Sequence, residues 1–106
     1  MREIDVAELN RLLAGPETAP ALVDVREPNE FQAGHVPGAV NIPMSQAVER
    51  VGELTDLAAR DGGLLLVCRS GNRSGQVGQW LSQQGHDVSN VLGGTLAWQQ
   101  AGYPTA

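Results

Sequence analysis

The spacing of apolar residues changes several times along the chain, and each change marks a boundary between predicted elements. The first apolar stripe begins after Asp5, which forms with Glu8 a pattern typical of a helix N-terminus. Its members recur at helical spacing and are Val6, Leu9, Leu12 and Leu13. Gly15 and Pro16 follow directly, so we predict a first helix that ends there.

Short apolar runs with the length and composition of strands lie at residues 21–25, 64–67 and 88–92. The run at 64–67 is apolar at every position, whereas a strand with one exposed face alternates apolar and polar residues. We therefore expect it to be a central strand covered on both faces. A shorter strand is predicted within residues 36–43, between a turn and the final proline.

Helix signals separate these strands. The predicted helix starts are Pro28, Ser45 as the cap of a helix through Leu54, Ser74 as the cap of a helix ended by Gly85, and Gly93-Gly94-Thr95. Strands and helices thus alternate, which predicts an α/β domain with a mainly parallel sheet. The length of 106 residues is that of a single domain, which we place at 1–106.

The charged residues narrow the range of partners. The chain has twelve acidic residues, seven arginines and no lysine, which gives a formal net charge of -5 and argues against binding to nucleic acid. Two of the arginines, Arg69 and Arg73, lie within five residues of the only cysteine, Cys68. A locally positive segment in an acidic chain indicates a small anionic ligand.

The N-terminal residues lack the basic start and apolar stretch of a signal peptide, and no apolar run is long enough to cross a membrane. A single cysteine cannot form an intramolecular disulfide, so nothing requires an oxidising compartment. We expect a cytoplasmic protein without membrane association. Two separated histidines and one cysteine also give no metal site, and no cofactor is predicted.

Cys68 directly follows the predicted central strand, at the sheet edge where ligands of α/β domains bind. Its sulfur would face the N-terminus of the next helix, with a guanidinium from Arg69 or Arg73 nearby, and each of these favours the nucleophilic thiolate. Gly71 lets the loop turn so that successive N–H groups point inward as an anion nest. The alternative is a buried, unreactive cysteine, which the polar run at 69–74 argues against.

The loop and three other segments resemble the rhodanese homology domain. The matching segments are Leu22-Val23-Asp24-Val25-Arg26, residues 34–43, Cys68-Arg69-Ser70-Gly71-Asn72-Arg73-Ser74, and Leu92-Gly93-Gly94 with Ala97-Trp98 and Gly102-Tyr103-Pro104. They span residues 4–104 in the order of the family.

The resemblance implies a three-layer α/β/α domain with a five-stranded sheet. It also implies a thiosulfate sulfurtransferase that carries sulfane sulfur as a Cys68 persulfide, cradled by residues 69–73. The donor would be a small anion such as thiosulfate, and the acceptor cyanide or a thiol, including a thiol of a thioredoxin-like protein. An alternative within the family is a persulfide relay to a protein acceptor in cofactor or tRNA thiolation.

Three residues outside the loop are candidates for lesser roles. Arg26 ends a strand at the same sheet edge as Cys68 and is a candidate for binding the anion, whereas a structural ion pair with Asp24 is the alternative for both. His35 lies in a Gly-His-Val-Pro-Gly turn, where we predict a hydrogen-bonded structural role rather than that of a base.

Two other classes of protein remain as alternatives. Cysteine phosphatases and arsenate reductases share this type of fold, but their loop places an arginine six positions after the cysteine. That position is Ser74 here, and the arginine comes one residue earlier, at Arg73. Non-catalytic binding modules of the family usually lack the cysteine, which this chain has.

Overall fold

Strands and helices alternate along the chain, as the sequence predicts. The computed structural model describes residues 1–15 and 19–106, and within them the strands are β1 (Arg2–Ile4), β2 (Ala21–Asp24), β3 (Val40–Asn41), β4 (Leu64–Val67) and β5 (Val88–Val91). The helices are α1 (Val6–Ala14), α2 (Pro28–Gln32), α3 (Val51–Ala58), α4 (Asn72–Gln83) and α5 (Gly94–Gln100), with a short 3-10 helix, η1 (Met44–Gln46).

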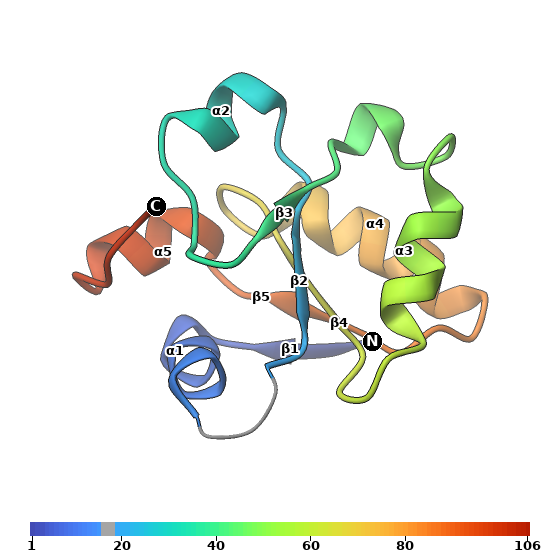
Figure 1. Ribbon diagram of the computed structural model, residues 1–106, viewed down its shortest axis with the longest axis horizontal. Coiled ribbons are helices and arrows are strands. Elements are labelled where there is room, and N and C mark those ends of the chain that lie inside the picture. The colour runs from blue at the N-terminus through green and yellow to red at the C-terminus, as the bar shows by residue number, and fades with distance from the viewer. Residues whose placement is uncertain (16–18) are drawn as a thin grey trace.

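These strands form one sheet in the order β1-β5-β4-β2-β3, and every pair in it is parallel. The α/β class and the five-stranded sheet are therefore confirmed, and the sheet is entirely rather than mainly parallel. Helices α1 and α5 cover one side of the sheet, and α3 and α4 cover the other (Figure 1). The predicted central strand, β4, lies in the middle of the sheet.

Alternate residues of β4 pack into two different cores, which explains its unbroken apolar sequence. Leu64 and Leu66 join the core beneath α3 and α4, and Cys68 continues the same alternation. Leu65 and Val67 join the core beneath α1 and α5, which contains the buried Trp98. A polar residue at any of these positions would lie in one core or the other.

The N-terminus of α1 forms as predicted, because the Asp5 carboxylate accepts a hydrogen bond from the Glu8 N–H at 2.9 Å. The helix ends at Ala14, while the predicted stop residue Pro16 lies outside the described residues. The strand β1 was not predicted, because Arg2 and Glu3 are exposed and give no apolar alternation.

Two of the predicted caps are wrong. Ser74 is not the cap of α4: the helix begins at Asn72, after Gly71 at a φ of +102°, so Ser74 lies inside the first turn and is buried. Ser45 lies within η1, and the helix expected from there begins only at Val51. In both cases the serine hydroxyl binds a side chain outside its own helix, Asn90 and Cys68 for Ser74 and Glu27 for Ser45.

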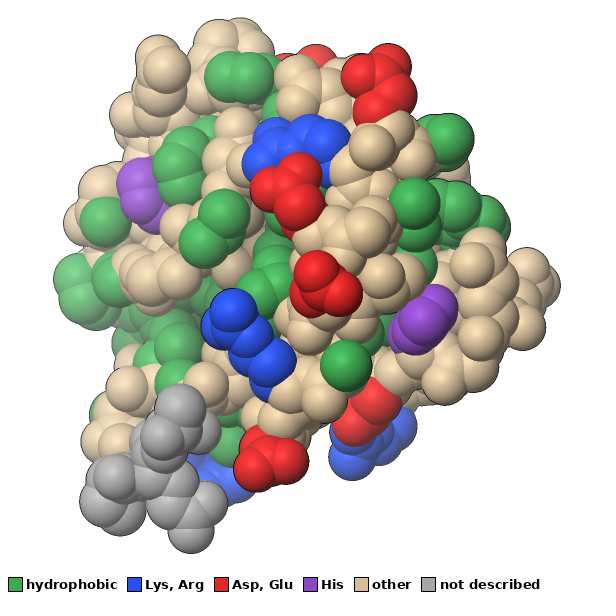
Figure 2. Space-filling model, turned by 45° about the vertical axis from the view of Figure 1, so that its right-hand side comes forward, with side chains coloured by type: hydrophobic (Ala, Val, Ile, Leu, Met, Phe, Trp, Pro, Cys, Tyr) green, Lys and Arg blue, Asp and Glu red, His purple; other side chains and the backbone are tan. Residues whose placement is uncertain are grey.

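Arginine and acidic side chains are interspersed on the molecular face shown in Figure 2. Within the described residues, no helix has both the length and the apolar character needed to cross a bilayer. The cytoplasmic location stays a prediction from the sequence.

Candidate active site

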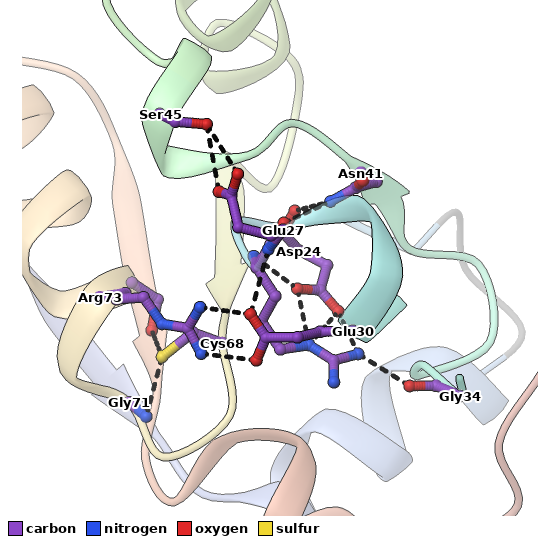
Figure 3. A network of polar contacts seen from close by, with 11 residues as sticks. Asp24, Glu27, Glu30, Gly34, Asn41, Ser45, Cys68, Gly71 and Arg73 are labelled. Atoms are coloured by element: carbon purple, nitrogen blue, oxygen red, sulfur yellow. Dashed lines mark hydrogen bonds and ion pairs between the residues drawn. The ribbon is translucent and has the colours of Figure 1, made fainter. Parts of the chain in front are cut away.

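Cys68 lies at the carboxyl end of the central strand, as predicted, on the side of the sheet covered by α4 (Figure 3). Its side chain is almost completely buried, at 1% exposure, so only a small part of the residue meets solvent. The chain then turns through residues 69–71 and enters α4, whose N-terminus faces the sulfur. A helix N-terminus stabilises negative charge placed before it.

Two hydrogen bonds hold the Cys68 sulfur. The Gly71 N–H donates to Sγ at 3.0 Å, and the Ser74 hydroxyl is 3.3 Å from it. The carbonyl groups of Cys68 and Arg69 point elsewhere, because they accept hydrogen bonds from the N–H groups of Thr95 and Leu96 in the first turn of α5. The loop thus presents donors to the sulfur and its carbonyl oxygens to α5.

Opposing effects set the pKa of Cys68. Burial raises the pKa of the thiol, because it disfavours the charged form. Hydrogen bonds from the Ser74 hydroxyl and from the backbone N–H groups of Ser74, Gly71 and Ser70 outweigh burial and bring the pKa below its ordinary value. The cradle therefore favours a thiolate, which is the nucleophilic form of cysteine.

Arg73 does not close the loop on itself but pairs with Glu30 of α2. Its Nη1 and Nη2 atoms donate to the two carboxylate oxygens of Glu30 at 2.6 and 2.9 Å. The Arg73 guanidinium lies between Cys68 and Glu30 in Figure 3. The hydrogen bond with Glu30 and the negative charges of Glu30 and Cys68 raise the pKa of Arg73. Glu30 thus balances the positive charge beside the sulfur.

Arg26 is buried in an ion pair with Asp24 at the end of β2. Its Nη2 is 2.9 Å from the Asp24 carboxylate and also donates to the Gly34 carbonyl at 2.8 Å, and the residue is 6% exposed. These contacts correspond to the structural alternative. The binding of a sulfur donor by Arg26 stays a prediction that these contacts do not support.

The other predicted loop residues are spread around the sulfur. Arg69 and Ser70 are exposed, so the Arg69 guanidinium is free to meet an anion arriving from solvent. Asn72 is also exposed and lines a hollow beside α4, together with Gly71 and Asn90. The loop therefore brings Cys68, Gly71 and Arg73 together and leaves Arg69 and Asn72 at the surface.

His35 has the structural contacts predicted for it. Its Nδ1 is 2.9 Å from the Phe31 carbonyl oxygen, and its ring stacks on that of Phe31 with centroids 3.7 Å apart. Both contacts fix the turn that follows α2.

Sequence reasoning missed several residues that build the site. Glu30 neutralises Arg73, Asn90 of β5 binds Ser74 and Gly71, and Gly94 packs against the Cys68 carbonyl. Each lies more than fifteen residues from its partner, so no local spacing could reveal it. The two polar residues in the otherwise apolar run 88–92, Ser89 and Asn90, were an available signal, but the sequence does not show which of them faces the site.

Comparison with known proteins agrees with this geometry. The family model described as a rhodanese-like domain matches residues 5–101. A protein of Allochromatium vinosum named sulfurtransferase is 38% identical, with 98% of this chain and 94% of that protein aligned. The putative sulfurtransferase YtwF of Bacillus subtilis is 36% identical over 93% of this chain and 91% of its own.

A solved structure gives the same result for the fold. The rhodanese-related protein of Thermoplasma volcanium superimposes with a TM-score of 0.86 and 34% identity, covering 100% of this chain and 98% of that one. A match of sequence and fold over nearly the whole length places the chain in the rhodanese-like domain family.

Proposed function

We propose that this protein is a sulfurtransferase that moves sulfane sulfur from a donor such as thiosulfate, through a persulfide on Cys68, to cyanide or a thiol. The observation that carries the proposal is the Cys68 sulfur, held by the Gly71 N–H and the Ser74 hydroxyl before the N-terminus of α4. Two relatives named as sulfurtransferases, aligned over more than 90% of this chain, support it.

In the proposed reaction the Cys68 thiolate attacks the outer sulfur of thiosulfate. A new S–S bond forms, the bond between the outer sulfur and the sulfonate breaks, and sulfite leaves with that electron pair. The terminal sulfur of the persulfide now carries the negative charge. An acceptor nucleophile then attacks this terminal sulfur, and the electron pair of the S–S bond returns to Cys68.

Each part of the loop has a task in this scheme. The N–H groups of residues 70, 71 and 74 stabilise negative charge first on Sγ and then on the terminal sulfur. Exposed Arg69 binds the sulfonate of the donor at the mouth of the loop. No base is required once the thiolate has formed, because the leaving group is an anion.

Mass spectrometry of the intact protein after incubation with thiosulfate tests the proposal. We expect a mass increase of one sulfur atom, located on Cys68 and accompanied by release of sulfite. The increase should disappear on treatment with cyanide, with formation of thiocyanate, and it should be absent in Cys68→Ala. Unmodified wild-type protein after incubation with excess thiosulfate would contradict the proposed donor and the function with it.

A further inference from the structure

Three buried polar groups lie in a row behind the loop. They are the Cys68 sulfur, the Ser74 hydroxyl in the first turn of α4, and the Asn90 amide on β5, and none is more than 4% exposed. The Ser74 Oγ atom is 3.3 Å from Sγ and 2.6 Å from the Asn90 Oδ1 atom. Asn90 is thus linked to the sulfur in two ways, through the Ser74 hydroxyl and through Gly71, whose N–H donates to Sγ.

The orientation of the Asn90 amide follows from its second contact. The amide nitrogen is 3.1 Å from the Gly71 carbonyl oxygen, which can only accept a hydrogen bond. The atom facing Gly71 is therefore Nδ2, and the atom facing Ser74 is Oδ1, an acceptor. Asn90 thus holds the loop by one end of its amide and competes for the serine hydroxyl by the other.

The hydroxyl of Ser74 has one proton and two acceptors within reach. While Cys68 is a thiol, its S–H can donate to Oγ and the serine can donate to Asn90. A thiolate has no proton to give and carries a full charge, so it draws the serine proton to itself and leaves Oδ1 of Asn90 without that donor. Formation of the thiolate is therefore opposed by Asn90.

The persulfide does not need the hydrogen bond from the Ser74 hydroxyl to Sγ. Once Sγ is bonded to a second sulfur, the negative charge resides on the terminal atom, and Sγ becomes a weak acceptor. The serine proton is then free to return to the Asn90 oxygen. The loaded state satisfies both Ser74 and Asn90, whereas the free thiolate does not.

We propose that Asn90 is a positioning residue that competes with the Cys68 sulfur for the Ser74 proton and so favours the persulfide over the free thiolate. This inference has two halves. The persulfide half, that Asn90 favours the persulfide, rests on the proposed function, whereas the competition for the Ser74 proton does not. The charged groups around Cys68 are Arg73 of α4 with Glu30 of α2, the Asp24–Arg26 pair at the end of β2, and exposed Arg69. They are the same in every variant below.

The direction in which the pKa of Cys68 changes in Asn90→Ala distinguishes this role from simple support of the loop. In Asn90→Ala the serine proton is released to the sulfur, so the pKa of Cys68 should fall by about half a unit, roughly a threefold rise in thiolate at a pH below the midpoint. If Asn90 only held Gly71 in place, its loss would loosen the Gly71 N–H contact and raise the pKa of Cys68. The pH dependence of the alkylation rate by iodoacetamide gives the pKa.

A double-variant cycle tests whether the effect passes through Ser74. Ser74→Ala should raise the pKa of Cys68, and adding Asn90→Ala to it should produce no fall. Ser89→Ala is the matched control, because Ser89 is the preceding residue of β5, is also buried, and faces the opposite side of the sheet. Asn90→Leu keeps the branched shape without polar atoms and replaces Asn90→Ala if the alanine variant does not fold.

The effect on the persulfide is tested at a fixed ratio of thiosulfate to sulfite and at a pH above the pKa of Cys68, where the ratio of persulfide to free thiolate should fall about threefold in Asn90→Ala. An unchanged or raised pKa in Asn90→Ala and Asn90→Leu, or a fall that persists without the Ser74 hydroxyl, would overturn the inference. A lowered pKa with an unchanged ratio of persulfide to thiolate at that pH would overturn the claim that Asn90 favours the persulfide. Absence of persulfide in the wild type would instead refute the proposed function. It would leave the competition for the Ser74 proton untouched, because the alkylation experiment uses no sulfur donor.

Discussion

At the scale of single residues, the charge near the sulfur depends on a pair rather than on one arginine. The sequence places Arg69 and Arg73 close to Cys68 and suggests two cations in the loop. In the structure Arg73 forms an ion pair with Glu30, and Arg69 lies exposed at the surface. The difference arises because Glu30 is forty-three residues away from Arg73 in the chain and comes near only through the fold.

Removing either member of this pair should shift the reactivity of Cys68 in opposite directions. In Arg73→Ala the Glu30 carboxylate stays without its cation near the sulfur, so the pKa of Cys68 should rise and alkylation at neutral pH should slow about threefold or more. In Glu30→Gln the uncompensated guanidinium should lower the pKa of Cys68 and speed alkylation. Equal changes of the same sign in both variants would show that the pair acts only by holding the loop.

At the scale of elements, the pair of Glu30 and Arg73 also joins α2 to α4. The hydrogen bond to Arg73 lowers the pKa of Glu30 to about 2, from an ordinary value of 4.5, despite the opposing effect of burial. A carboxyl whose pKa is lower in the folded protein contributes stability above its unfolded pKa, and that contribution disappears as the pH falls through the folded pKa. The attachment of α2 is therefore expected to weaken between about pH 4.5 and pH 2.

Glu30→Gln should lower the free energy of unfolding by about 1 kcal/mol at pH 7, since the pair is bidentate but partly exposed. The difference from the wild type should shrink as the pH is lowered and vanish near pH 2. Urea denaturation across this range measures it. Glu53→Gln, which removes a more exposed carboxylate from its Arg50 pair, is the control and should change stability little.

The loop is also supported from behind by the first turn of α5. Gly94 has a φ of +59°, and a Cβ atom there would lie 2.3 Å from the Cys68 carbonyl oxygen. No side chain fits between α5 and the loop at this point. The sequence showed the glycine pair and a following helix, but it gave no sign that the helix packs on the residue carrying the sulfur.

Gly94→Ala should therefore displace the loop and reduce persulfide formation by more than tenfold. Gly102→Ala is the control that separates the steric clash in Gly94→Ala from the backbone strain of an alanine at positive φ. Gly102 has a φ of +82° but nothing within 4 Å of its Cβ position. We expect Gly102→Ala to lose about 1 kcal/mol of stability and keep its sulfur uptake. Similar uptake by both variants would show that the loop tolerates a shift of α5.

At the scale of the whole molecule, local patterns predicted most of the elements and a parallel sheet, but not strand β1 or how distant segments complete the site. The continuous apolar run of β4 indicated a central strand, and the Asp5 cap and glycine stops indicated helices, because these signals are local. The cap prediction for Ser74 was wrong because its hydroxyl binds Cys68 and Asn90 instead of the helix backbone. Such contacts depend on the order of strands, which local spacing does not specify.

The arrangement of the whole site predicts which substrates it excludes. An oxyanion such as a phosphate ester needs several donors around its oxygen atoms and an arginine that binds it. Here the loop donors converge on one sulfur position, and both terminal nitrogens of Arg73 are bound to Glu30. Thiosulfate needs only its outer sulfur to enter, and its sulfonate stays outside near Arg69.

We therefore expect sulfur transfer from thiosulfate and negligible hydrolysis of aryl phosphates, measured as thiocyanate and as nitrophenol released by the same preparation. Glu30→Gln alone should not create phosphatase activity, because the loop keeps its size and its donors still converge on a single atom. Inserting one glycine between Gly71 and Asn72 enlarges the ring and moves Arg73 to six positions after Cys68. This should weaken sulfur transfer, because Ser74 is then seven positions after Cys68 and its hydroxyl is displaced from Sγ. Hydrolysis of aryl phosphates by the unmodified protein that is lost in Cys68→Ala would show that loop size does not select the substrate.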